Sequence, residues 1–355
     1  MGFTGLLQLL QVALVLGIFG SVGVYITGST ADIWVAYPGT QSIDQGRPIN
    51  PDIEMLLHMD NEVSQVEPFV WIDGDWRGAR DTGGVSVFVS GIDPRQQGLI
   101  FAKTLPAKLR VRLAEPDAVI VDRADLDKLG VGIGSHATIN GHRVVVVGVG
   151  SGLRALGGVN VIASLTTARR LGGTPNDGDR PTYLVARLHH PAQAAVVAGR
   201  LNGRNGFGPY QVWTADDFAR QSVMYWMFNT GAGAGVLFLA GIVFLVGAVI
   251  TSQTLAAAVF SSVREYATLN ALGVGMRALR SVVLEQALWV GALGLSGASI
   301  LSGLMLVLAQ SQDVPMVLNV SASIACLLLM MTLAVFSGLA AMRSLRHADP
   351  ATLLR

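Results

Sequence analysis

Cysteine is nearly absent from this 355-residue chain, and charged residues are scarce. The only cysteine is Cys326, so no disulfide can form within the chain. Charged residues make up 14% of the sequence and hydrophobic residues 51%, and the mean hydropathy is +0.50. A composition so poor in charge and so rich in apolar residues is typical of a membrane protein that also carries a soluble part.

Several catalytic patterns are also missing. The three lysines, Lys103, Lys108 and Lys128, do not follow glycine, so the sequence contains no P-loop and cannot bind ATP in that way. It has no Gly-x-Ser-x-Gly elbow, and its six histidines show no His-x-x-x-His pair. We therefore expect no catalytic residue, no metal site and no cofactor bound by this chain.

Long apolar runs are abundant instead. A membrane-spanning helix needs about 20 apolar residues, because its backbone must satisfy its own hydrogen bonds in lipid. Four segments meet this requirement, and the first lacks the basic start and cleavage site of a signal peptide. We expect transmembrane helices within 1–28, 214–252, 281–309 and 314–342.

Charge placement predicts the orientation of these spans. Residues 29–227 contain 19 of the 25 Lys and Arg residues and 20 of the 24 Asp and Glu residues, as in an ordinary soluble domain. The other six basic residues lie in two short segments, 253–280 and 343–355. By the positive-inside rule both segments are cytosolic, so residues 29–213 and the short loop 310–313 lie outside the membrane.

The external domain, 29–213, has a mixed α/β pattern. Short β-like runs alternate with helical ones, and Asn140-Gly141 between two such runs is a strong hairpin signal. The order of elements predicts two lobes, with one of about 106–180 inserted into the other. Overall we expect an α-helical membrane protein with four transmembrane helices and one large external α/β domain.

A helical stalk is predicted to connect this domain to the second span. Thr214 followed by Asp217 resembles a capping box, and the sequence continues without proline through Gln221 to residue 252. We expect one continuous helix. Each glycine near residue 231 weakens that continuity by about 1 kcal/mol relative to alanine.

The cytosolic segment 253–280 contains an amphipathic pattern. Apolar residues recur every three positions from 263 to 272, with Arg264 and Glu265 between them, until Gly273 ends the pattern. Periodicity alone allows a helix on the lipid surface or a docking face for a cytosolic protein.

Two motifs resemble those of a known family. The run from Arg264 to Gly273, "REYATLNALG", is similar to the cytosolic signature of the FtsX/MacB superfamily of ABC transporter permeases. The terminal "RSLRHADPATLLR" is similar to that superfamily's closing pattern. The segment 116–150 resembles its external-domain module, and "ADIWVAYPGT" makes the DevC-like branch the best match.

The resemblance implies a permease subunit without enzymatic activity of its own. It implies a homodimer that works with two copies of a cytosolic ATPase, which would bind the ATP and Mg. Outside the membrane it implies an adaptor of the HlyD type and an outer-membrane channel; membrane lipid is a further expected contact, and nucleic acid is not. The coupling helix that contacts the ATPase would comprise Val263, Arg264, Glu265, Tyr266, Leu269, Leu272 and Gly273.

Three functions remain compatible with the sequence. The first is export of an amphiphilic substrate by transmission of ATP-driven motion to the external domain. The second is extraction of lipoproteins from the membrane, as in the Lol branch. The third is signalling of the FtsX kind, in which the subunit moves no substrate and controls an external cell-wall hydrolase.

Overall fold

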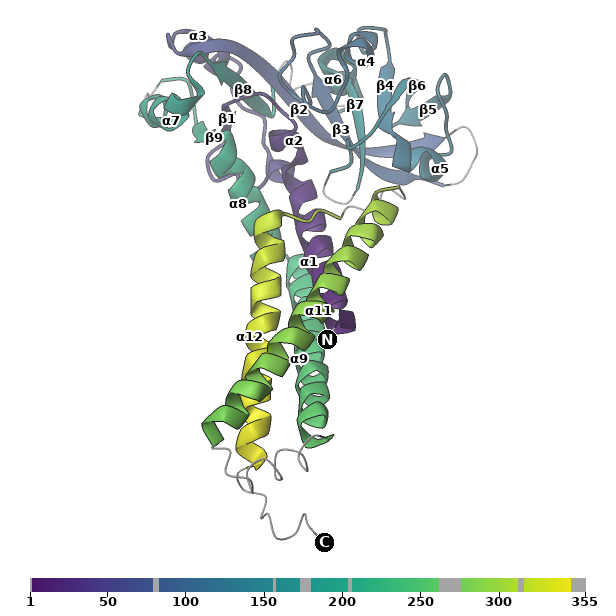
Figure 1. The fold of residues 1–355 in the computed structure, drawn as a ribbon. Coiled ribbons are helices and arrows are strands. Elements are labelled where there is room, and N and C mark those ends of the chain that lie inside the picture. Colours follow the sequence, from purple (N-terminus) through teal and green to yellow (C-terminus); the bar gives the residue numbers. More distant parts are fainter. Residues whose placement is uncertain are drawn as a thin grey trace. The chain divides into compact units, whose positions relative to one another are not determined.

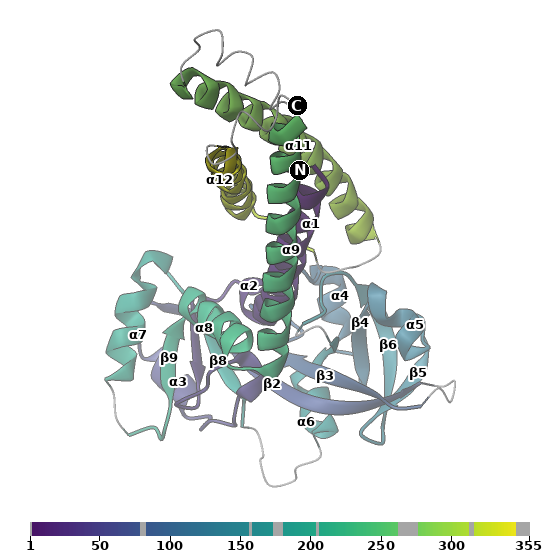
Figure 2. The same ribbon diagram turned by 90° about the horizontal axis from the view of Figure 1, so that it is seen from below.

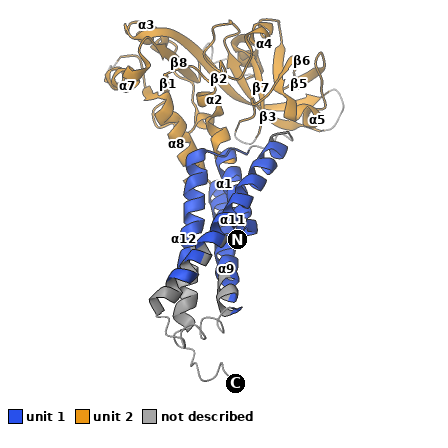
Figure 3. Cartoon of the chain, viewed as in Figure 1, with its two compact units in different colours: residues 1–17, 231–355 blue, residues 18–230 orange. Residues whose placement is uncertain are grey.

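The computed structural model describes residues 2–78, 83–155, 158–172, 180–203, 206–261, 276–311 and 316–345. The chain divides into two compact units, which Figure 3 colours separately. The helical unit comprises residues 1–17 and 231–355, and the sheet unit comprises residues 18–230.

The helical unit is built from long apolar helices. They are α1 (Gly2–Gly20), α9 (Gly231–Ser261), α11 (Met276–Ser311) and α12 (Val320–Leu345). Among the described residues, three segments are long and apolar enough to cross a membrane: Gly2–Thr27, Gly231–Thr254 and Gly291–Ala309. The apolar stretch of α12, Val320–Leu333, is shorter. The fourth expected span, 314–342, therefore stays a prediction.

A polar contact joins α1 to α9 inside the helical unit. The buried hydroxyls of Thr4 and Thr251 are 3.1 Å apart. One turn further along α1, the side-chain amide of Gln8 donates to the carbonyl of Val243 over 3.2 Å. Gly247 makes room for this contact, because a Cβ atom there would lie 2.8 Å from Gln8 Nε2. Such hydrogen bonds between apolar helices contribute about 1 kcal/mol each and so stabilise this pair.

The described residues of the sheet unit form a sheet of nine strands in the order β3-β7-β4-β6-β5-β2-β8-β1-β9, with β3 also paired to β2 (Figure 1). The strands are β1 (Ile33–Ala36), β2 (Val63–Gly78), β3 (Val85–Ile92), β4 (Ala118–Asp122), β5 (His136–Ile139), β6 (His142–Gly150), β7 (Val159–Ser164), β8 (Tyr183–Leu188) and β9 (Gln211–Thr214). Its helices are α2 (Val24–Thr27), α3 (Ile53–His58), α4 (Ala107–Arg112), α5 (Leu126–Leu129), α6 (Leu165–Leu171), α7 (Ala194–Asn202) and α8 (Ala215–Phe228), with short 3-10 turns between them.

The long strand β2 belongs to both halves of this sheet. Its first part pairs antiparallel with β8, and its second part pairs with β3 and then with β5. One apolar core lies around β1, β8, α3 and α7, and another around β3 to β7. The segment expected as a lobe, 106–180, supplies β4 to β7, but its half of the sheet also includes β3 and the end of β2. Because β2 pairs with β5 and β8, which are distant from it in the sequence, no local sequence pattern predicts these pairings.

The hairpin expected at Asn140-Gly141 joins β5 to β6. Both turn residues have positive φ, 49° and 80°, as a type I′ turn requires. The side chain of Asn140 also accepts a hydrogen bond from the amide of Asp75 over 2.8 Å and donates to the carbonyl of Leu171 over 3.0 Å. The turn residue therefore ties the hairpin to β2 and α6.

The helix expected to run unbroken from Thr214 into the second span is interrupted. α8 ends at Phe228, and α9 begins at Gly231. At the interruption the hydroxyl of Thr230 donates to the carbonyl of Trp226 over 2.6 Å, which satisfies an acceptor at the end of α8. The expectation of one helix was wrong because this local cap and the glycines that follow favour a helix end over continuation.

Candidate functional site

The residues predicted to contact an ATPase lie outside the described residues. The gap 262–275 contains the whole predicted coupling helix: Val263, Arg264, Glu265, Tyr266, Leu269, Leu272 and Gly273. Their role stays a prediction. The predicted stalk residues Thr214, Asp217 and Gln221 are described and lie at or on α8, a helix that is anchored in the sheet unit.

The start of α8 is fixed by Thr214. This residue is the N-cap in extended conformation, and its Oγ1 accepts a hydrogen bond from the amide of Asp217 over 3.1 Å. The same hydroxyl donates to the Asp217 carboxylate over 2.8 Å. Asp217 lies in the first turn, where the helix dipole favours negative charge. Together these contacts hold the first turn of α8 at the end of β9.

Further along, α8 is bound to the segment between β1 and α3. The side-chain amide of Gln221 donates to the carbonyl of Thr40 over 2.9 Å. Trp226 Nε1 donates to a carboxylate oxygen of Asp44 over 3.1 Å. Sequence reasoning identified Gln221 only as a helical position and missed Trp226. An indole N–H in a predicted helix was the available signal, because a partly buried donor needs a partner.

The apolar face of α8 is anchored through Phe218, which is fully buried. Its ring lies 5.3 Å from Trp213, 5.8 Å from Trp34 and 6.0 Å from Tyr183, measured between centroids. Aromatic pairs at such distances contribute about 0.5 to 1.5 kcal/mol beyond the area that they bury. Burial also raises the pKa of the Tyr183 hydroxyl well above its ordinary value. This end of α8 is therefore fixed in the core.

A second helix, α2, enters the same core. Tyr25 lies in the segment expected as the first span, yet it is fully buried in the sheet unit. Its hydroxyl donates to Asn160 Oδ1 and accepts from Trp71 Nε1, both over 3.3 Å. Its ring lies 5.7 Å from that of Phe101. The expected span 1–28 thus reaches into the sheet unit, because hydropathy does not distinguish burial in lipid from burial in protein.

The two anchored helices are neighbours. α2 and α8 lie side by side in both ribbon views (Figures 1 and 2), and Tyr25 and Phe218 belong to one apolar core. Displacement of either helix therefore disturbs the packing of the other.

The C-terminal end of α2 is covered by residues 99–104. The amide of Lys103 donates to the carbonyl of Gly28, and its ammonium group donates to the carbonyl of Thr27 over 2.9 Å. In the other direction, the amide of Thr30 donates to the carbonyl of Leu99 over 3.0 Å. A cation and a backbone donor at a helix C-terminus satisfy free carbonyls and complement the dipole. Nothing in the sequence pattern predicted this cap.

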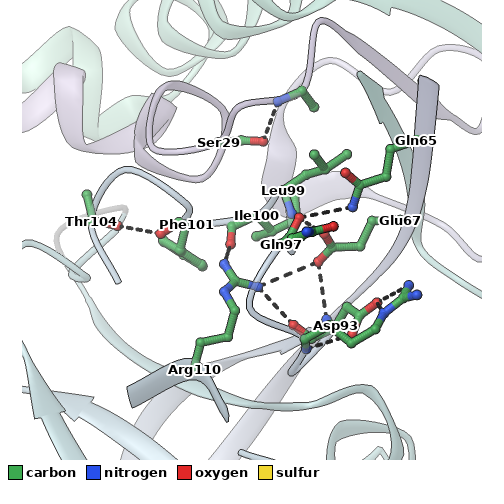
Figure 4. A network of polar contacts seen from close by, with 12 residues as sticks. Ser29, Gln65, Glu67, Asp93, Gln97, Leu99, Ile100, Phe101, Thr104 and Arg110 are labelled. Atoms are coloured by element: carbon green, nitrogen blue, oxygen red, sulfur yellow. Dashed lines mark hydrogen bonds and ion pairs between the residues drawn. The ribbon is translucent and has the colours of Figure 1, made fainter. Parts of the chain in front are cut away.

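Behind this cap, two charged side chains are buried together (Figure 4). Glu67 on β2 and Arg110 on α4 are 0% and 1% exposed, and their closest charged atoms are 4.0 Å apart. The Glu67 carboxylate accepts hydrogen bonds from the amides of Asp93 and Leu99. The Arg110 guanidinium donates to the carbonyls of Asp93 and Ile100. Each buried charge is thus paired and also bound to the backbone of one loop, 93–105.

The pKa values of these groups reflect their surroundings. Burial raises the pKa of Glu67, although the amide of Leu99 and the Arg110 charge oppose it. Burial likewise lowers the pKa of Arg110. For Asp93, burial acts upward, but the hydrogen bonds from Arg95 outweigh it, so the pKa of Asp93 lies below its ordinary value. Desolvation of the buried pair is therefore only partly offset by its hydrogen bonds and by the attraction between the two charges.

Within the described part of the chain, no three His, Cys, Asp or Glu residues gather in a possible metal site. The polar groups at α2 and α8 bind backbone and hold helix ends. This arrangement suits the mechanical connection of helices to a sheet.

Two protein-family models match the sequence. The model of the MacB-like periplasmic core domain matches residues 9–204, and that of the FtsX-like permease C-terminal region matches residues 237–350. The first match alone covers more than half of the chain. A comparison with curated proteins gives no match.

Three solved structures that are similar to this chain are distant from it in sequence. The extracellular domain of the noncanonic ABC-type transporter YknZ from Gram-positive bacteria is 15% identical, with 52% of this chain and 99% of that chain covered and a TM-score of 0.37. The periplasmic region of MacB from Actinobacillus actinomycetemcomitans is 14% identical, with 55% and 94% covered and a TM-score of 0.37. A domain of a putative permease from Porphyromonas gingivalis is 11% identical, with 52% and 88% covered and a TM-score of 0.32.

A MacB-like periplasmic core domain followed by an FtsX-like permease C-terminal region, in a chain with apolar helices of membrane-spanning length, identifies a membrane permease with a periplasmic domain. The chain belongs to the FtsX/MacB-type family of ABC transporter permeases. Permeases of this family work with ATPase partners in ABC systems.

Proposed function

We propose that this chain is the transmembrane subunit of an ABC export complex and passes ATP-driven motion to its periplasmic unit. The anchoring of α2 and α8 in one aromatic core is the observation that carries this proposal. Along the chain, α2 follows α1 and α8 precedes α9. The segments that contain α1 and α9 are apolar and long enough to span a membrane. A movement of these spans therefore reaches the sheet through buried contacts.

The proposal includes a defined set of partners. Two ATPase subunits bind ATP and Mg and dock on the coupling helix, while this chain binds no cofactor and catalyses no reaction. A second copy of the chain completes the membrane part, which lies in the inner membrane with four spans. A HlyD-type adaptor and an outer-membrane channel carry an amphiphilic substrate onward, as expected for the DevC-like branch.

The docking of the ATPase is tested by reversing charge and polarity in the coupling helix. We expect Glu265→Lys or Leu269→Asp to reduce co-purification of the ATPase, because a charge forced into a docking face costs about 2 to 5 kcal/mol. Glu115→Lys is the matched control, since Glu115 lies after α4 in the sheet unit and is exposed. The measurement is the amount of ATPase retained on the purified, detergent-solubilised subunit.

Membrane insertion should be equal in all three variants. If both coupling-helix variants retain the ATPase and support export as well as the wild type, residues 262–275 form a lipid-facing segment and the proposed docking is wrong. A different outcome supports the signalling function: the ATPase binds, ATP changes the activity of an external cell-wall hydrolase, and no substrate is exported.

A further inference from the structure

The two ends of the loop 93–105 contact different parts of the sheet unit. Its outer end, residues 95–97, lines a cleft of about 670 Å³ together with parts of α3 and β2. Seven of the eight residues that line the cleft are polar or charged: Glu54, His58, Ser64, Gln65, Arg95, Gln96 and Gln97. One hydrogen bond joins two sides of the cleft, from the side-chain amide of Gln65 to the carbonyl of Gln97 over 3.0 Å.

The inner end of the same loop covers the end of α2. Leu99 and Lys103 exchange backbone hydrogen bonds with Thr30 and Gly28, each over 3.0 Å. Phe101 packs on Tyr25 and adopts a φ of 55°, a region that bulky residues rarely occupy. Strain of this kind persists only where the surrounding contacts hold it. The backbone at this end therefore has little freedom to move independently of α2.

The buried pair lies between the two ends (Figure 4). Glu67 and Arg110 contact the loop at residue 93, just before its outer part, and at residues 99 and 100, where its inner part begins. Gly98 is also packed against the guanidinium, because an added Cβ atom would collide with it. Four backbone groups of the loop thus depend on two charged side chains from β2 and α4.

We propose that Glu67 and Arg110 are positioning residues that make the loop 93–105 a rigid link between the end of α2 and the outer cleft. The inference rests on the proposed function. In it, the loop 93–105 is the element through which a movement of α2 changes the shape of the outer cleft. A buried ion pair is rarely the most stable choice for a core, and apolar replacements are often equally stable. The pair instead fixes one backbone arrangement of the loop, which apolar packing alone would not specify.

The link is tested with Glu67→Gln in the full-length protein. The amide is nearly isosteric with the carboxylate but has one acceptor oxygen, and its NH₂ group faces a backbone donor. We expect about tenfold faster hydrogen exchange at the amides of Thr30 and Lys103, which Glu67 does not touch. Asp75→Asn on the same strand is the matched control, since its partner Arg77 is 3.2 Å away and both side chains are exposed. It should leave the exchange unchanged.

A second measurement tests what the link does. Spin labels at Gln96→Cys and Asp52→Cys, in a Cys326→Ala background, report the distance across the outer cleft in protein reconstituted with its ATPase. We expect Mg–ATP to change this distance in the otherwise unaltered protein and in the Asp75→Asn control, and to have no effect in the Glu67→Gln variant.

Gly98→Ala provides an independent variant that keeps both charges and displaces the Arg110 guanidinium. It should raise exchange at the same two amides. Unchanged exchange at Thr30 and Lys103 in both variants would show that the pair does not hold the cap. If hydrogen exchange at these amides is faster but Mg–ATP still changes the spin-label distance, the loop does not link α2 to the outer cleft. Absence of any response in the otherwise unaltered labelled protein would contradict the proposed function itself, whatever the exchange shows.

Discussion

At the residue scale, two neighbouring carboxylates in the sheet unit are tuned in opposite directions. Glu67 is fully buried, and burial raises its pKa. Asp93 lies next to Arg95, whose hydrogen bonds lower the pKa of Asp93 despite partial burial. Both accept hydrogen bonds from the backbone of the loop 93–105, yet only Asp93 gains stability from being charged in the folded state.

This difference predicts how Asp93 contributes to acid stability. Because folding lowers the pKa of Asp93 below its ordinary 3.8, its contribution is fully present above that value and is lost as the pH falls through the folded-state pKa. We expect Asp93→Asn to be less stable than the wild type near neutral pH and to lose less stability on acidification below about pH 4. Near-UV circular dichroism during thermal unfolding, measured at several pH values, follows the difference.

Asp75→Asn again serves as the control, since exposed ion pairs contribute about 0 to 1 kcal/mol. It should follow the wild-type pH dependence. A wild-type pH profile for the Asp93 variant would mean that its carboxylate does not interact with Arg95 in solution.

At the scale of elements, α8 is held in the sheet unit by side-chain contacts along its length. Phe218 holds its first half in the aromatic core, and the bond from Trp226 to Asp44 holds its second half. Gln221 lies between them and is bonded to the carbonyl of Thr40. A break at this position would uncouple the two halves without removing either anchor.

We therefore expect Gln221→Pro to abolish transport while the ATPase still binds and hydrolyses ATP. Proline removes a helical hydrogen bond and clashes with the preceding turn, at a cost of about 3 kcal/mol. Gln221→Ala keeps the helix and loses one hydrogen bond, worth about 1 kcal/mol, so it should transport nearly normally. Transport and ATPase activity are measured in both variants after reconstitution with the ATPase and any adaptor. Normal transport by the proline variant would exclude α8 as the transmitting element.

At the scale of the whole molecule, charge placement predicts the topology. Six basic residues outside 29–227 fall into two short segments, and the segment between the third and fourth spans has none. Reporter fusions after Leu272 and after Arg355 should therefore be active only as cytosolic reporters. Fusions at Asn140, in an exposed turn of the sheet unit, should be active only as periplasmic ones. A periplasmic signal from the Leu272 fusion would overturn the orientation.

Much of the architecture could be predicted because its signals are local. The hairpin at Asn140-Gly141 and the cap at Thr214 each depend on residues within four positions of one another. The apolar segments that form α1, α9 and α11 follow from length and composition. The unbroken helix was predicted wrongly. Each glycine after Thr230 disfavours a helix by about 1 kcal/mol relative to alanine, and the hydrogen bond from Thr230 to Trp226 is a further local contribution to the helix end.

The amino-acid sequence by itself determined that this chain is a membrane protein with an inserted α/β domain, and the two motifs in its predicted cytosolic segments indicated the family. Those conclusions rest on hydropathy, charge and short motifs, which need no knowledge of distant contacts. Only the tertiary structure decided that Tyr25 belongs to a protein core and that β2 serves both halves of the sheet. It also decided that Glu67 and Arg110, 43 positions apart in the sequence, are buried together. Burial of an ion pair depends on which surfaces pack together after folding, and a local sequence pattern does not predict that packing.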